Sequence, residues 1–150
     1  MIWSRKYTLE EINSMNKGNM GEFLEIEFIE IGDSHIVAKM PVTSKVKQPA
    51  GLLHGGASVV LAETIGSVAA NLCVNMDEVI CVGLEINANH LRAVKDGFVY
   101  ATATPVHRGS TTQVWNIEIK NEQGKLTCVS RLTTAAVQIK KKTLDPLLKK

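Results

Sequence analysis

The feature that most constrains this chain is a helical stretch from Gly55 to about Val74 that lacks a polar face. Its larger apolar residues recur at intervals of three and four, which is the period of one face of an α-helix. Small residues fill much of the opposite face. A helix that is apolar nearly all round is a buried helix, so we expect the rest of the chain to wrap around this segment.

The sequence before and after this helix predicts the strands that would surround it. Alternating residues predict a hairpin around Gly32-Asp33, and a capping box of Thr8 and Glu11 predicts a short helix over residues 8–16. Four strands with short polar connections follow the long helix and indicate an antiparallel meander. The predicted strands are 22–31, 35–42, 79–91, 97–107, 111–121 and 125–139. We therefore expect an α+β domain in which one curved antiparallel sheet wraps around a central helix.

Length and charge agree with one small domain over residues 1–139, followed by a basic, mobile C-terminal tail at 140–150. Five of the 17 basic residues lie in that tail, so the body lacks the basic face that nucleic-acid binding requires. Glu63 and three glycines argue against a membrane span in the longest apolar segment. Three cysteines without CxxC spacing, and no signal-peptide pattern in residues 1–20, predict a cytoplasmic protein.

Glu63 is the most informative residue for function. It is the one charged residue between His54 and Asp77, and its helical neighbours are apolar or small. We expect burial to raise the pKa of this carboxyl group, and an unpaired buried carboxylate costs several kcal/mol. A fold that accepts such a cost commonly uses the group in catalysis. The alternative is a structural glutamate whose carboxylate is satisfied by Ser67 or by a backbone donor.

The sequence His54-Gly55-Gly56 opens the long helix. The first turn of a helix presents unpaired N–H groups and a partial positive charge, and glycine lets a ligand approach the backbone closely. These properties predict a site that polarises a carbonyl group. The alternative is a simple entry turn in which His54 makes a local hydrogen bond.

Polar residues also gather in one loop and at two strand ends. Gln48 lies in the loop before the long helix, beside Pro49 and Gly51. His90 and Arg92 lie at the end of one predicted strand, and residues 107–111 lie at the end of another. If those strand ends are adjacent, their basic and hydroxyl groups can bind phosphate. The alternative is that these are ordinary polar residues of exposed turns with no ligand to bind.

The stretch from Gln48 through His54-Gly55-Gly56 and Glu63 to Ser67 resembles the central motif of hotdog-fold acyl-CoA thioesterases. The likeness runs from about Trp3 to Val137 and is greatest for the aryl-CoA and 4-hydroxybenzoyl-CoA branch. Within it, the chain is most similar to the 1,4-dihydroxy-2-naphthoyl-CoA hydrolases of menaquinone synthesis and to the proofreading thioesterases of the enterobactin pathway. Further matching stretches are 82–90, 107–110 and 113–115.

The resemblance implies a role for each matching residue. Glu63 is implied to be the nucleophile or the general base, the Gly55 N–H to polarise the thioester carbonyl, and Gln48 to orient the thioester or water. Ser67 is implied to support the attacking water, with His54 near the reacting group. The implied coenzyme A contacts are Gly83, His90, Leu91, Arg92, Ala93, His107, Arg108, Gly109, Ser110, Thr111 and Thr112. No metal and no cofactor beyond the coenzyme A of the substrate is implied.

The spacing of Gly55 and Glu63 predicts a dimer. Eight residues on one helix separate them by about 12 Å along its axis, whereas attacker and carbonyl donor must meet at one carbon. Two chains can satisfy both requirements, with Gln48, His54 and Gly55 from one chain and Glu63 and Ser67 from the other. The family resemblance further implies a homotetramer built as a dimer of dimers.

Two other functions remain open from the sequence. A hydratase or dehydratase acting on acyl thioesters pairs a histidine with an acid, and His54 and Glu63 supply such a pair. A non-enzymatic acyl-CoA-binding protein needs neither group for chemistry. Hydrolysis of an aryl-CoA to the free acid and coenzyme A is the function that the resemblance favours.

Overall fold

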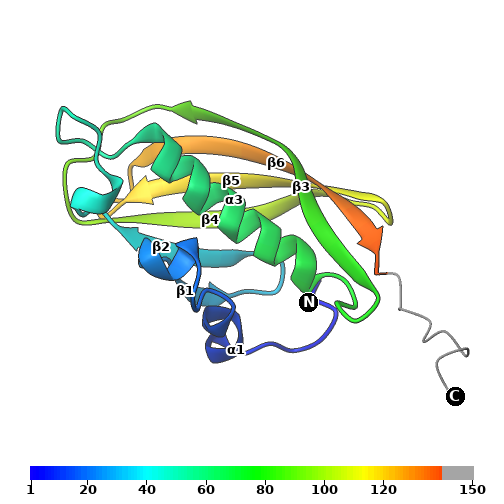
Figure 1. Cartoon of the computed structure of the whole chain (residues 1–150). Helices are drawn as coiled ribbons and strands as arrows, with labels where there is room; N and C mark the ends of the chain where they lie inside the picture. The colour runs from blue at the N-terminus through cyan, green and yellow to red at the C-terminus, as the bar shows by residue number, and fades with distance from the viewer. Residues whose placement is uncertain (140–150) are drawn as a thin grey trace, which may run out of the picture.

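The computed structural model describes residues 1–139; the predicted basic tail, residues 140–150, lies outside the described residues. A six-stranded antiparallel sheet curves around one long helix, α3 (Gly55–Leu72) (Figure 1). The strands are β1 (Glu27–Ile31), β2 (Ile36–Pro41), β3 (Val79–His90), β4 (Phe98–Arg108), β5 (Thr112–Asn121) and β6 (Leu126–Gln138). This is the predicted α+β hotdog architecture.

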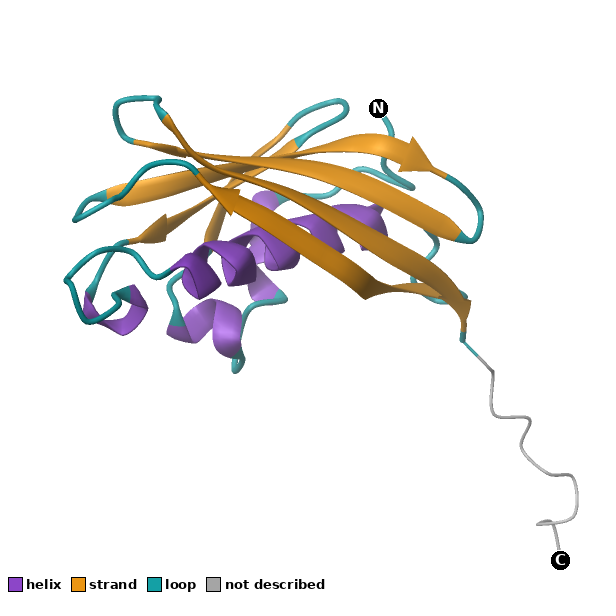
Figure 2. Ribbon diagram, turned by 90° about the horizontal axis from the view of Figure 1, so that it is seen from above, coloured by secondary structure: helices purple, strands orange, loops and turns teal. Residues whose placement is uncertain are grey.

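The helices lie on one side of the sheet (Figure 2). Besides α3 they are α1 (Leu9–Ser14), the single turn α2 (Met20–Phe23) and a 3₁₀ turn at Ser44–Val46. Leu61, Ile65 and Ala69 of α3 are fully buried against the sheet, and the core continues into Trp115 and Ile117 of β5. Among the described residues, no helix is long and apolar enough to cross a membrane.

Helix α3 approaches the sheet closely because of a glycine. A Cβ placed on Gly66 would lie 2.6 Å from Leu132 Cδ2 on β6, so a larger residue here would require the Leu132 side chain or the helix to shift within a close-packed core. The opposite side of α3 is less covered, and Gly56 and Glu63 are exposed. The prediction of a helix buried all round is therefore wrong for a single chain, because nothing in residues 1–139 packs over that side.

The first predicted helix and hairpin are present, with one change. The Thr8–Glu11 capping box forms in both directions, and β1 and β2 pair around the turn after Ile31. The strand predicted over 22–31 begins at Glu27, because α2 occupies Met20–Phe23. Asn19 caps that turn by accepting a hydrogen bond from the Gly21 N–H, a polar signal that competes with strand alternation.

The predicted meander is correct for β4, β5 and β6 and wrong for β3. The sheet order is β1-β2-β4-β5-β6-β3, so β3 pairs with β6 rather than with β4. The segment from Leu91 to Gly97 is therefore not a hairpin turn; it crosses the end of the sheet, where the Leu91 N–H donates to the Thr127 carbonyl. Local turn residues do not distinguish a hairpin from such a crossing.

Strand β3 forms an edge of the sheet and leaves apolar side chains uncovered. It pairs along one side with β6, and a bulge at Leu84 interrupts the register. Ile80, Val82 and Leu84 are exposed. A 12-residue edge strand with exposed apolar groups is a natural surface for pairing with another strand.

Candidate active site

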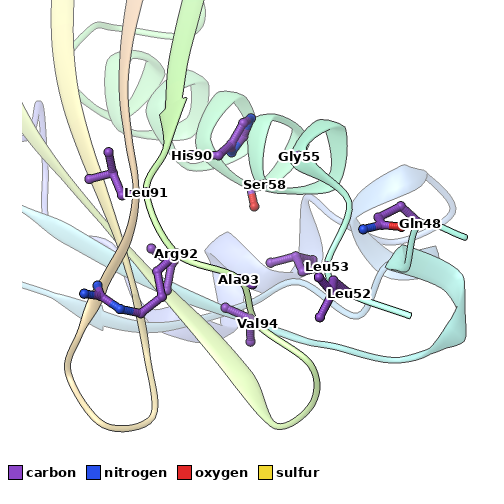
Figure 3. A pocket seen from close by; sticks show the side chains of 11 residues that line it. Gln48, Leu52, Leu53, Gly55, Ser58, His90, Leu91, Arg92, Ala93 and Val94 are labelled. Atoms are coloured by element: carbon purple, nitrogen blue, oxygen red, sulfur yellow. The ribbon is translucent and has the colours of Figure 1, made fainter. Parts of the chain in front are cut away.

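A pocket of about 350 Å³ opens at the first turn of α3. Helix α3, the loop before it and the segment after β3 enclose this pocket, which we call the Gly55 pocket (Figure 3). Its lining residues are Gln48, Leu52, Leu53, Gly55, Ser58, His90, Leu91, Arg92, Ala93, Val94 and Thr127. The structure thus brings the predicted residues Gln48, Gly55 and His90 to Ala93 together.

The backbone N–H groups of the first turn are satisfied except at Gly55. The Gly56 N–H donates to His54 Nδ1 at 2.8 Å, and the Ala57 and Ser58 N–H groups donate to the His54 carbonyl. The Gly55 N–H has no acceptor within residues 1–139. It is therefore free to donate to a ligand carbonyl, at the end of the helix that carries the partial positive charge.

His54 is the N-cap of α3. Its Nδ1 accepts the Gly56 hydrogen bond, so Nε2 carries the proton of the neutral ring. The imidazole is exposed. The local hydrogen bond, which was one of the two alternatives for His54, is present. Through it the His54 side chain helps to hold the backbone of the first turn on either side of Gly55.

His90 packs directly over Gly55. A Cβ placed on Gly55 would lie 2.7 Å from His90 Nε2, so a larger residue cannot stand here unless the imidazole moves. Gln48 lies across the pocket, and its Oε1 accepts a hydrogen bond from the Ala50 N–H. That bond fixes the amide, and Nε2 is left as a donor for a ligand.

Glu63 lies elsewhere, two helical turns further along α3. Its Oε1 would be 3.0 Å from a Cβ on Gly83 of β3, so the predicted coenzyme A residue Gly83 lies beside this carboxylate, outside the Gly55 pocket. The carboxylate is exposed in the single chain. The expected burial of Glu63 is therefore wrong for one chain, because its side of α3 has no cover.

Ser67 lies in a different depression of about 250 Å³, near the C-terminal end of α3. The depression is mostly apolar and is also lined by Val68, Asn71 and Ile80. The Asn71 amide pairs with both backbone groups of Cys81 at 2.8 and 3.0 Å. That pairing holds β3 against the helix beside Glu63 and Ser67.

The two predicted groups of coenzyme A residues lie at opposite ends of the sheet within one chain. His90 to Ala93 lie beside the start of β6, whereas residues 107–112 lie beside its end. Arg108 donates to the Ile2 carbonyl at 3.0 Å. Burial raises the pKa of the Cys73 thiol, despite the neighbouring Arg108 guanidinium. The expectation that these strand ends are adjacent is wrong for a single chain, because two antiparallel strands that follow one another along the chain end at opposite edges of the sheet.

Sequence reasoning missed Ser58 as a site residue. Ser58 is 4% exposed, and its hydroxyl points into the Gly55 pocket (Figure 3). It lies three residues after Gly55, and this spacing places it on the same helix face, a signal that was available in the sequence. Thr127 and Val94 also line the pocket, and they come from elements whose pairing the sequence did not predict.

The chain belongs to the thioesterase superfamily, whose family model matches residues 50–128. The sheet and central helix agree with that assignment, and the chain is a thioester hydrolase. Within residues 1–139, no group of three His, Cys, Asp or Glu side chains is placed to hold a metal ion.

Named relatives cover almost the whole chain. A 1,4-dihydroxy-2-naphthoyl-CoA hydrolase from Escherichia coli (strain K12) is 59% identical over 135 residues, 90% of this chain and 98% of that protein. The proofreading thioesterase EntH from Cronobacter turicensis is 47% identical over 137 residues, 91% of this chain and 99% of that protein. A mutant thioesterase from Pseudomonas aeruginosa superposes with a TM-score of 0.91 at 47% identity, covering 93% of this chain and all of that one.

Proposed function

We propose that this chain hydrolyses an aryl-CoA thioester to the free acid and coenzyme A, in a dimer whose two active sites each combine residues of both subunits. The observation that carries the proposal is the unpaired Gly55 N–H, which opens into a pocket lined by Gln48, Ser58 and His90. A donor held in this way stabilises negative charge on a thioester oxygen as the tetrahedral intermediate forms.

The reaction needs an attacking oxygen and a leaving thiolate. The Glu63 carboxylate either attacks the thioester carbon, forming an anhydride that water then cleaves, or removes a proton from an attacking water. In both versions the C–S bond breaks and coenzyme A leaves as a thiolate. Because a thiolate is a good leaving group, the site needs no strong acid beside the sulfur.

Glu63 has to come from a second subunit. It lies about 12 Å along the axis of α3 from Gly55 and does not line the Gly55 pocket. The exposed edge of β3, with Ile80 and Val82 uncovered, suits antiparallel pairing with β3 of another copy. That pairing would also bring residues 107–112 of one subunit toward His90 of the other, and so unite the predicted coenzyme A contacts. Assembly of dimers into a tetramer remains a prediction.

The aryl group is proposed from the relatives. The Escherichia coli relative is named for 1,4-dihydroxy-2-naphthoyl-CoA, and this chain matches it over nearly the full length of both proteins. We therefore propose 1,4-dihydroxy-2-naphthoyl-CoA as the first substrate to test, with menaquinone synthesis as the context.

A thiol-release assay tests the function. Coenzyme A release is followed with a thiol reagent for 1,4-dihydroxy-2-naphthoyl-CoA, benzoyl-CoA, butyryl-CoA and palmitoyl-CoA, with Glu63→Ala as the inactive control. The expected result is the highest kcat/KM for the aryl substrates and loss of release in the variant. Loss of double-bond absorbance from crotonyl-CoA without thiol release would instead indicate a hydratase, and tight acyl-CoA binding with neither signal would indicate a binding protein.

A further inference from the structure

A second apolar pocket, of about 290 Å³, lies on the other side of the α3 N-terminus. We call it the α2 pocket, because two of its walls are Met20 and Phe23 of α2. Both side chains are exposed, at 62% and 63%. The remaining lining residues are Leu24, Lys45, Val46, Lys47, His54, Ala57 and Val60.

Helix α2 is held firmly although its apolar side chains are exposed. The Asn19 side chain caps the turn through the Gly21 N–H and donates back to the Met15 carbonyl. At the other end, Lys45 Nζ donates to the Phe23 carbonyl at 3.2 Å and pairs with Glu25 at 2.7 Å. Four polar contacts thus fix a turn that does not bury its own Met20 and Phe23. Such an arrangement suits a preformed wall for a ligand.

The α2 pocket and the Gly55 pocket flank the reacting position. His54 lines the α2 pocket, and the next residue, Gly55, lines the other one. A thioester bound to the Gly55 N–H has two arms, the acyl group and the pantetheine chain. The Gly55 pocket has polar groups suited to pantetheine amides, from Gln48 and Ser58. The α2 pocket offers mostly apolar side chains, including an aromatic ring.

We propose that Met20 and Phe23 are specificity-determining residues that form the wall against which an aromatic acyl group binds. This inference rests on the proposed function and names the part of the chain that selects the acyl group. A flat aryl ring gains from offset or edge contact with Phe23 and from contact with the Met20 sulfur. A short alkyl group has too little surface to reach this wall.

Single and double variants of this wall test the inference. Met20→Ala, Phe23→Ala and the double variant are compared with wild type on benzoyl-CoA and butyryl-CoA. Because a lost apolar contact is commonly worth about tenfold in discrimination, we expect kcat/KM for benzoyl-CoA to fall about tenfold in the double variant. Most of that fall should be in KM, and butyryl-CoA should change less than about twofold. Val106→Ala, at a valine that is 61% exposed on β4, is the matched control and should leave the ratio unchanged.

The outcomes separate this inference from the proposed function. Wild type that releases no coenzyme A from either substrate contradicts the proposed function. Active wild type with an unchanged substrate ratio in the double variant overturns the role of Met20 and Phe23. An equal fall on both substrates also overturns it, since the wall would then act on the shared coenzyme A arm or on folding. A changed ratio in Val68→Ala, at a residue that lines the depression beside Ser67, with an unchanged ratio in the double variant, would assign the acyl group to that depression instead.

Discussion

The first turn and the middle of α3 differ in how completely one chain builds its surroundings. At the first turn, His54 accepts from the Gly56 N–H, His90 packs over Gly55, and Ser58 is buried beside them. In the middle, Glu63 is exposed and lies beside Gly83. In the proposed mechanism the first turn binds the carbonyl and Glu63 attacks it, and one chain builds the surroundings of the first turn but leaves Glu63 exposed and without a cover. A second copy of the chain is the simplest supplier of that cover.

The largest expected effect on turnover comes from changing Glu63, in the exposed middle of α3. Glu63→Gln keeps the size of the side chain but removes its charge and basicity, so we expect turnover to fall at least about a hundredfold with KM little changed. Steady-state thiol release measures both constants. Glu10→Gln, at an acidic residue in the first turn of α1, is the control. Near-normal turnover in Glu63→Gln would show that the carboxylate is not part of the reaction.

A smaller effect on turnover is expected from changing Gly55 in the first turn of α3. Gly55→Ala introduces a Cβ 2.7 Å from His90 Nε2, so the imidazole or the first turn must move away from the carbonyl. Displacing one such donor should lower kcat by about tenfold to a hundredfold, less than its complete removal. Adding His90→Ala relieves the clash, and the double variant should lose less than the product of the two single effects. Strict multiplication of the losses would argue against this contact.

The smallest effect separates the two roles of His54. His54→Ala removes the cap at the Gly56 N–H and should lower the free energy of unfolding by about 1 kcal/mol, as measured by urea denaturation. His54→Asn keeps a side-chain acceptor at the N-cap and should restore most of that stability. If His54 acts as a cap alone, His54→Asn also restores kcat. Restored stability with low kcat would assign the imidazole a direct part in the reaction.

Features that depend on local sequence were predicted well. The Thr8 capping box, the β1–β2 hairpin and the span of α3 follow from period and capping chemistry within a few residues. The short turn α2 was missed because the Asn19 cap competes with an alternating pattern. Ser58 was missed although its spacing from Gly55 placed it on the same side of the helix.

Features that depend on distant pairing were predicted poorly. The position of β3 next to β6 could not follow from turn residues. The grouping of His90 with Arg108 overlooked that successive antiparallel strands end at opposite edges of the sheet. The burial of Glu63 was inferred from the small and apolar residues around it. The proposed dimer accounts for those residues as part of an interface between subunits.

The most direct test of the central claim combines two chains that are each impaired in a different half of the proposed site. Gly55→Ala and Glu63→Gln subunits carrying different affinity tags are produced together, and the mixed dimer is purified through both tags. If each site takes Gly55 from one subunit and Glu63 from the other, one of the two sites in the mixed dimer is intact, and its activity should be about half that of wild type. A mixed dimer no more active than its parent variants would contradict a shared active site.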